Sequence, residues 1–174
     1  MTTYARERFV WKFLFAAILS IVMAISVMPV GGKPAGAVEE SGGTRFTFKR
    51  TERCLMHRIN RARVNHGRRR LEADKQLAYV ARQHARRMAN SGGVWHDSTI
   101  GWKVTRWRRL AQNTGRGASC ASLSRSFMAS STHRNTILGR FKYIGVGVEN
   151  RNGRLFVQEL FESRRNPGNV YHYP

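Results

Sequence analysis

Two cysteines and six histidines are the side chains of this chain with the most chemistry to offer. Cys54 and Cys120 do not form a Cys-x-x-Cys pair, which excludes a zinc knuckle and a dithiol redox motif. In an oxidising compartment they could form a disulfide, and closing a loop of this size would add roughly 4 kcal/mol of stability. Two buried free thiols are the alternative, because the sequence does not give their separation. A disulfide requires Cα atoms within about 7 Å of each other.

A second group of chemically capable side chains lies between positions 95 and 107. Three tryptophans alternate there with basic residues, namely Trp95, Trp102 and Trp107 with Lys103, Arg106, Arg108 and Arg109. This composition is typical of a patch that binds nucleic acid or another anionic polymer. It is also typical of a loop that packs tryptophans over a cleft. The segment therefore indicates a binding surface or a packed loop.

The histidines differ in the role that their surroundings predict. His84 falls within a helical stripe formed by Leu77, Val80, Ala81, Ala85 and Met88, so we expect it to be packed rather than to bind a metal. His57, His66 and His172 have no partner visible in the sequence, and we expect them at the surface.

These residues must be positioned by a small number of helices and strands. Helical patterns run over 51–65, from Asp74 to about 90, and more weakly over 118–130, and a short turn follows from Asn135 to Leu138. Alternating apolar residues predict strands over 143–149 and 154–162, joined at the hairpin turn Asn152-Gly153. Helices followed by a hairpin predict an α+β domain with helices covering a sheet. The expected core contains Ile59, Leu77, Met88, Phe127, Ile144, Val146 and Phe161.

The first part of the chain predicts export. Basic residues precede a charge-free run over 13–30, and Ala35-Gly36-Ala37 is a cleavage pattern before Val38. An uncleaved membrane anchor is the alternative, since about 18 apolar residues nearly suffice to span a bilayer. Prolines and glycines over 29–34 favour cleavage. The sequence thus divides into a signal peptide over 1–37, a linker over 38–50 and a domain over 51–174.

The chain is strongly basic, with 31 Lys and Arg against 10 Asp and Glu and a net charge of +21. This balance points to anionic partners or to a solvated cationic surface. With 41% hydrophobic residues among its 174, the chain has enough apolar material for a core, which argues against wholesale disorder.

Four blocks of sequence, taken in order, resemble the bacterial branch of the CAP superfamily. They are LMHRINRARVNHGRRRLEADKQLAYVARQHARRMANSGGVWHDS, LAQNTGRG, FMASSTHRNTIL and YIGVGVENRNGRLFVQELF. This superfamily, also called SCP-like, includes cysteine-rich secretory proteins, antigen 5 and pathogenesis-related proteins. The resemblance implies a three-layer α-β-α sandwich, secretion, and a cavity lined by two histidines and two acids.

The resemblance assigns four cavity positions, two of which depart from the family. His96 and His133 match the family histidines, whereas Gln112 and Ser130 occupy the positions of the acids. His96 and His133 could hold a divalent ion such as zinc, but a firm site needs three or four ligands. We therefore expect weak metal binding and no catalytic residue.

A secreted, non-enzymatic binding module for lipid or for an anionic cell-envelope polymer is the function that the resemblance implies best. A secreted hydrolase that uses His96 and His133 is the first alternative. A basic nucleic-acid-binding protein is the second, disfavoured because export removes most nucleic acid from reach. Membrane association is expected only if the N-terminal segment is not cleaved, and the sequence does not indicate an oligomeric state.

Overall fold

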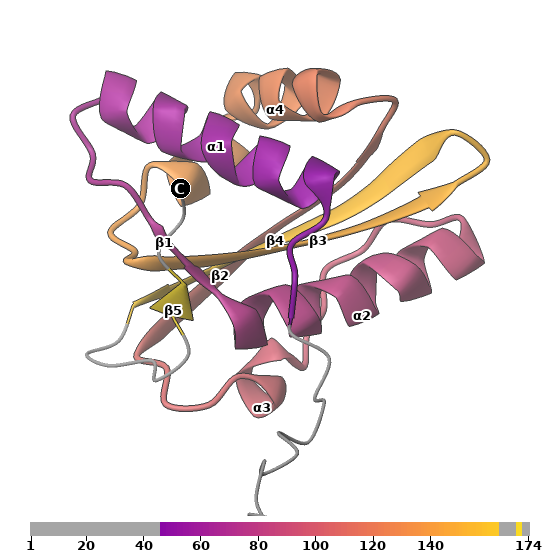
Figure 1. Cartoon of the computed structure of the whole chain (residues 1–174), viewed down its shortest axis with the longest axis horizontal. Coiled ribbons are helices and arrows are strands. Elements are labelled where there is room, and N and C mark those ends of the chain that lie inside the picture. Colours follow the sequence, from indigo (N-terminus) through magenta and orange to yellow (C-terminus); the bar gives the residue numbers. More distant parts are fainter. Residues whose placement is uncertain (1–45, 164–169, 172–174) are drawn as a thin grey trace, which may run out of the picture. The chain divides into compact units, whose positions relative to one another are not determined.

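The computed structural model describes residues 46–163 together with the backbone of 170–171 (Figure 1). The elements follow in the order α1 (Arg50–Asn65), β1 (Glu72–Asp74), α2 (Lys75–Ser91), α3 (Ile100–Lys103), β2 (Arg109–Gly117), α4 (Cys120–Ala129), α5 (Ser131–Ile137), β3 (Tyr143–Arg151), β4 (Arg154–Ser163) and β5 (Val170–Tyr171). The predicted signal peptide over 1–37, the first part of the predicted linker and His172 lie outside the described residues. No described helix is long and apolar enough to cross a membrane.

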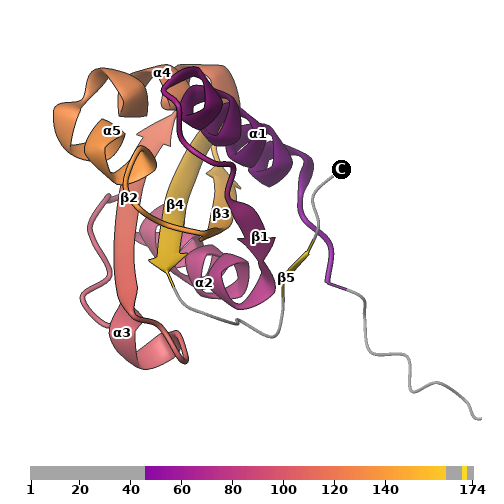
Figure 2. The ribbon, with the colours of Figure 1, turned by 90° about the vertical axis from the view of Figure 1, so that its left-hand side faces the viewer.

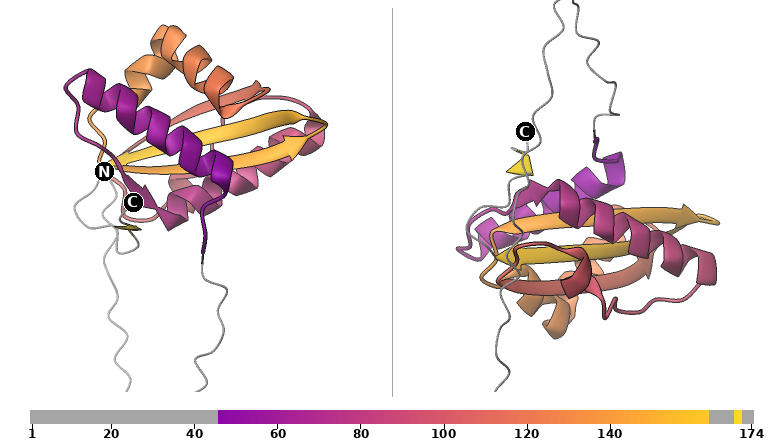
Figure 3. Two further views of the ribbon diagram at one scale, coloured as in Figure 1. Left: turned by 45° about the horizontal axis from the view of Figure 1, so that its top comes forward. Right: turned by 90° about the horizontal axis from the view of Figure 1, so that it is seen from below.

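A single sheet with strand order β2-β4-β3-β1-β5 forms the middle layer. Strand β1 runs parallel to β3, and the other neighbouring strands are antiparallel. Helices α1, α4 and α5 cover one face of the sheet, and α2 and α3 lie on the other (Figures 1 and 2). Seen from below, α2 extends along β3 and β4 (Figure 3). The three-layer α-β-α sandwich predicted from the sequence is confirmed.

The two longest helices begin and end where their sequences provide the required groups. The Asp74 carboxylate caps α2 by accepting a hydrogen bond of 2.9 Å from the backbone N–H of Leu77. Gly92 then ends α2 in the left-handed conformation, with φ of +74°. Helix α1 starts at Arg50 and stops before Gly67, which also has a positive φ. Both helices therefore agree with the sequence prediction to within one residue.

The C-terminal hairpin is the centre of the sheet. Asn152 and Gly153 have φ of +51° and +71°, the conformation that a two-residue hairpin turn requires. Strand β4 is buried on both faces because it lies between β2 and β3 and is covered by helices above and below. Gly147 on β3 allows the closest approach: a Cβ there would lie 2.1 Å from the backbone of α2. A glycine at this point therefore sets the spacing between α2 and the sheet.

The predicted core is confirmed. Seven residues from both helical layers and from the hairpin are at most 3% exposed, namely Ile59, Leu77, Met88, Phe127, Ile144, Val146 and Phe161. They divide between a cluster under α1 and α4 and smaller clusters under α2. The domain thus has hydrophobic layers on both faces of its sheet.

Several short or polar elements differ from the prediction. Residues 131–137 form helix α5 where the sequence predicted only a turn from Asn135 to Leu138. Strand β2, the short strand β1 and the single-turn helix α3 were not predicted. The sequence of β2, RLAQNTGRG, lacks alternating apolar residues, and the buried residues of the strand are the polar Asn113 and Thr114.

The last part of the predicted linker, over 46–50, belongs to the folded domain, so the predicted boundary at 51 is too late. Phe48 packs against the core under α1, and Arg50 is already helical. Arg82 on α2 holds the segment: its guanidinium stacks 4.4 Å from the ring centre of Phe46 and donates 2.6 Å to the Thr47 carbonyl. Arg82 also donates hydrogen bonds to the buried carboxylate of Glu52, which fixes the position of its guanidinium.

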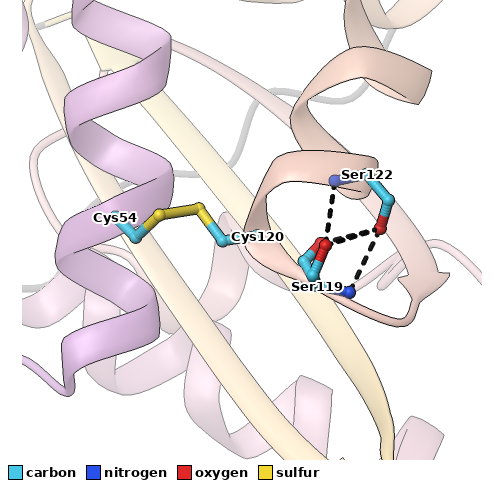
Figure 4. Close-up of a disulfide and its surroundings, with 4 residues drawn as sticks. All are labelled: Cys54, Ser119, Cys120 and Ser122. Atoms are coloured by element: carbon cyan, nitrogen blue, oxygen red, sulfur yellow. Dashed lines mark hydrogen bonds between the residues drawn. A yellow bond between two sulfur atoms is a disulfide. The ribbon is translucent and has the colours of Figure 1, made fainter.

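Helices α1 and α4 are joined covalently. Cys54 and Cys120 form a disulfide, with Cα atoms 6.3 Å apart, and Cys120 is the first residue of α4 (Figure 4). Ser119 caps the same helix end, since its hydroxyl accepts a hydrogen bond of 3.1 Å from the backbone N–H of Ser122. The bridge resolves the alternatives left open by the sequence in favour of a disulfide.

Candidate functional site

Strand β2 organises the site because its side chains point alternately to the two faces of the sheet. Gln112 contacts the loop that follows α2, whereas Asn113 contacts α5. The strand lies at one edge of the sheet, next to β4. Residues predicted from separate sequence blocks therefore approach β2 from opposite helical layers.

Gln112 joins β2 to the loop that carries His96. Its Oε1 accepts 3.0 Å from the backbone N–H of Asp97, and its Nε2 donates 2.9 Å to the Asp97 carbonyl. Gln158 on β4 donates a further hydrogen bond of 2.7 Å to the same Oε1. The Gln112 amide thus pairs with the backbone N–H and C=O of Asp97 as a neighbouring strand would. Its Oε1 already accepts two hydrogen bonds. Gln112 positions His96 rather than offering a spare ligand.

Asp97 is a buried carboxylate that the sequence analysis did not single out. Its Oδ2 accepts hydrogen bonds from Lys103 at 2.6 Å and Arg87 at 2.9 Å. Its Oδ1 accepts from the hydroxyl and the backbone N–H of Thr99. Although burial alone would raise the pKa of Asp97, the hydrogen bonds from Lys103 and Thr99 hold it well below the usual range. The carboxylate is therefore charged at neutral pH, and its oxygens are occupied.

His84 fixes the start of the same loop. The ring is 1% exposed, and its Nε2–H donates 2.8 Å to the Trp95 carbonyl while Nδ1 accepts from Arg87 at 3.2 Å. Burial lowers the pKa of His84, so the imidazole stays neutral. The prediction of a packed, structural histidine is confirmed.

His133 and His96 approach each other from the two sides. His133, on α5, is half-buried, and its Nδ1 lies 2.9 Å from the Ser130 hydroxyl. Burial, and then the charge of His96, lower the pKa of His133, so the two imidazoles are close enough to interact electrostatically. His96 is exposed. Because Ser130 occupies Nδ1, the Nε2 atom of His133 is the ring nitrogen left for a ligand. We call His96, Ser130 and His133 the histidine site.

A second buried carboxylate, Glu159 on β4, lies behind the histidine site. The Asn113 amide donates 3.0 Å to Glu159 Oε2 and 3.3 Å to the carbonyl of His133. Glu159 is fully buried, and its Oε1 has no hydrogen-bond partner among the described residues. Burial raises the pKa of Glu159 to about 8, and the Asn113 hydrogen bond only partly offsets this effect. Glu159 is therefore protonated at neutral pH.

The site has too few free ligand groups to bind a metal ion tightly. Among the described residues, no group of three or more His, Cys, Asp or Glu side chains is arranged to hold a metal ion. Gln112 and Asp97 have committed their oxygens, which leaves two imidazoles as the only strong donors of the site. Weak binding of zinc by His96 and His133 stays a prediction.

The tryptophan-rich segment is largely exposed beside this loop. Trp102 on α3 is 91% exposed, while Trp95 and Trp107 are about half that. Trp107 donates 3.0 Å to the Gly101 carbonyl, and the Trp95 ring meets His84 edge-on. Arg106 and Arg108 are exposed and form no ion pair within 46–163. The segment combines packed indole rings with open cationic surface.

His57 and His66 lie at the surface, as the sequence predicted. His57 and His66 are exposed, and the Nδ1–H of His66 donates 2.8 Å to the Ala62 carbonyl. The two buried acids were missed, although Glu159 had a usable signal. It alternates with Val157 and Phe161 along β4 and so falls on the same inward face. Asp97 had no comparable signal, because its partners come from α2 and α3.

The sequence of this α-β-α sandwich matches the model of one protein family. The CAP family, described as the cysteine-rich secretory protein family, matches residues 56–160, which is more than half of the chain. The chain therefore belongs to the cysteine-rich secretory protein family. No curated protein sequence matches the chain.

Solved structures with the same fold come from bacteria and from a flatworm. An outer surface protein from Borrelia burgdorferi has a TM-score of 0.62 at 16% identity, over 69% of this chain and 97% of that one. An extracellular protein containing a SCP domain from Bacillus anthracis has a TM-score of 0.60 at 23% identity, over 66% of this chain but 40% of that one. The venom allergen-like protein 4 of Schistosoma mansoni has a TM-score of 0.56 at 13% identity, over 73% of this chain and 97% of that one. At these identities the likeness shows the fold.

Proposed function

We propose that this protein is an exported, non-enzymatic binding module that holds an anionic lipid headgroup or an anionic cell-envelope polymer at the histidine site. The observation that carries the proposal is the state of Asp97. Four hydrogen bonds from Lys103, Arg87 and Thr99 occupy this carboxylate, so the groups of the site left open to a ligand are the imidazoles of His96 and His133. A site with open donors and no open carboxylate favours an anion.

Export is supported by the N-terminal sequence, by the disulfide and by two relatives. The pattern before Val38 is typical of a signal peptide, and disulfides persist in oxidising compartments. Two of the structural relatives are described as an outer surface protein and an extracellular protein. A ligand from the cell envelope would be within reach of a protein exported to the same place.

The proposal predicts the direction of the pH dependence. Burial and the charge of His96 lower the pKa of His133, so His133 is neutral at pH 7.5 and gains a proton as the pH falls. An anion interacts more strongly with an imidazolium than with an imidazole, and its binding should therefore strengthen on acidification. Zinc requires neutral imidazoles and would be lost over the same range. The two kinds of ligand respond to acid in opposite directions.

Co-sedimentation with vesicles and pull-down with envelope polymer test the proposal. We expect anionic vesicles or polymer to bind the protein several-fold more tightly at pH 5.5 than at 7.5, and zwitterionic vesicles to bind it weakly. The double substitution His96→Ala and His133→Ala should remove the pH-dependent part, whereas His66→Ala serves as the exposed-histidine control. Equal binding by the double variant and the control would refute the site.

Ser130 and His133 support one competing function, a hydrolase. The hydroxyl and Nδ1 are 2.9 Å apart, which is the contact of a nucleophile with its base. In a serine hydrolase a third group orients the other ring nitrogen, and within 46–163 no carboxylate forms a hydrogen bond with His133. An ester substrate panel decides: turnover that disappears in Ser130→Ala would favour the hydrolase.

A further inference from the structure

The outer side of α1 carries a second cationic site, away from the histidine site. A cavity of about 510 Å³ lies between α1 and α4, next to the disulfide. Its lining is dominated by basic side chains, namely Arg50, Arg53, His57, Arg58 and Arg61, with Ser124 from α4. We call this cavity the arginine groove. None of its residues belongs to the histidine site.

The arginines follow one stripe of the helix. Counted from Arg50, the basic positions of the groove occur at offsets 0, 3, 7, 8 and 11, which places them on neighbouring turns of one helical face. The stripe spans about 16 Å along the axis, at roughly 1.5 Å per residue. This length exceeds what one small anion can contact. A chain with repeated anionic groups could contact the whole stripe.

The groove has no anion of its own. The only carboxylate on α1 is Glu52, which is fully buried and paired with Arg82. Within 46–163 the groove arginines form no ion pair, and only Arg53 has a hydrogen bond, to the Phe48 carbonyl. Like charges at this spacing on a helix repel each other. An external polyanion would relieve that repulsion.

The disulfide gives the groove a fixed wall. Cys54 lines the cavity and binds α1 covalently to the first residue of α4 (Figure 4). Figures 1 and 2 show the two helices side by side on the same face of the sheet. The groove is therefore present before a ligand binds, which reduces the cost of ordering it.

We propose that the arginine groove binds a phosphodiester polymer of the cell envelope, laid along α1. Guanidinium groups match phosphate oxygens in a bidentate geometry, and every basic residue of the groove apart from His57 is an arginine. Export favours an envelope polymer over nucleic acid as the source of the phosphates. This site is independent of the histidine site, so either proposal can fail without the other.

A matched pair of charge variants tests the groove. Arg58→Gln with Arg61→Gln removes two groove arginines that form no hydrogen bond within 46–163, so the fold should persist. Arg86→Gln with Arg140→Gln removes the same charge from two exposed positions outside the groove. The probe is a fluorescent glycerol-phosphate oligomer of about ten units, and its affinity is measured at about 50 to 300 mM salt. Each phosphate contact contributes about −0.7 to the slope of log K against log salt.

We expect the groove variant to lose about tenfold or more in affinity and its salt slope to fall by about 1.4, because two phosphate contacts are lost. The control pair should change the affinity by less than about twofold. Equal losses in both pairs would show that the net charge of the chain, not the groove, binds the oligomer. Tighter binding of an oligothymidylate with the same number of phosphates would favour nucleic acid and overturn the proposed source. Circular dichroism checks that both variants fold.

Discussion

Replacing Glu159 by glutamine removes a buried acid whose raised pKa keeps it protonated at neutral pH. Glu159 on β4 is fully buried, and within 46–163 the hydrogen bond that it accepts comes from Asn113. Burial raises its pKa from the ordinary value of 4.5 to about 8. Glutamine has nearly the same shape but cannot ionise. The variant therefore separates the effect of charge from the effect of packing.

The magnitude follows from linkage between proton binding and folding. Below pH 4.5 both states of the chain carry the proton, and Glu159 imposes no ionisation penalty. Between pH 4.5 and about 8 the unfolded chain loses the proton while the folded chain keeps it, so the stability of the wild type falls as the pH rises. At about 1.4 kcal/mol per pKa unit, the full loss is about 5 kcal/mol. Above pH 8 the penalty stays constant.

Urea unfolding followed by circular dichroism, at intervals from pH 4 to 9, measures the effect. The quantity of interest is the free energy of unfolding of Glu159→Gln minus that of the wild type, because contributions of His84 and His133 cancel in the difference. We expect this difference to rise by about 5 kcal/mol between pH 4 and 9. A control, Glu149→Gln, removes a carboxylate that is 31% exposed and should change the profile by less than about 1 kcal/mol. Parallel curves for Glu159→Gln and the wild type would refute the reasoning.

Three further predictions concern the groups that hold the site. Replacing Cys54 and Cys120 by serine should lower the free energy of unfolding by about 4 kcal/mol, since the bridge closes a loop of 66 residues; an unchanged urea midpoint would show that the bridge does not form. Gly147→Ala should cost more than about 3 kcal/mol, because the new methyl group meets the α2 backbone, whereas Gly93→Ala meets the side chains of Trp95 and Ser91 and should cost far less. Gln112→Glu removes the N–H that donates to the Asp97 carbonyl and should cost about 1–3 kcal/mol of stability, with shifted NMR signals for His96. Unmoved His96 signals would mean that Gln112 does not position this loop.

The sequence predicts those parts of the fold in which local pattern and tertiary packing agree. The stripe around His84 and Met88 fits the buried face of α2, and Asn152-Gly153 fits the hairpin turn. Strand β2 was missed because Gln112 and Asn113 are stabilised by hydrogen bonds to distant elements. Helix α5, with the sequence STHRNTI, has weak helical preference of its own and forms where it packs on α4 and β2.

The candidate site was only half predictable for a similar reason. The family resemblance places His96 and His133 at the site, and the structure brings their imidazoles within electrostatic reach. The resemblance could not show that Gln112 pairs with the backbone of Asp97, because this contact depends on the path of a loop between two elements. The hydrogen-bond partners of Asp97 come from three segments of the chain. The spacing of residues along the sequence does not predict that these segments meet.

NMR spectra of the histidine rings, recorded during titration with glycerol phosphate, test the central claim most directly. His96 and His133 report on the histidine site, His57 on the arginine groove, and the buried His84 serves as an internal control. We predict saturable shifts of the His96 and His133 signals, a rise in the pKa of His133 as the anion binds, and no change at His84. Unchanged His96 and His133 signals, or a shift at His57 alone, would contradict the assignment of the histidine site as the anion-binding site.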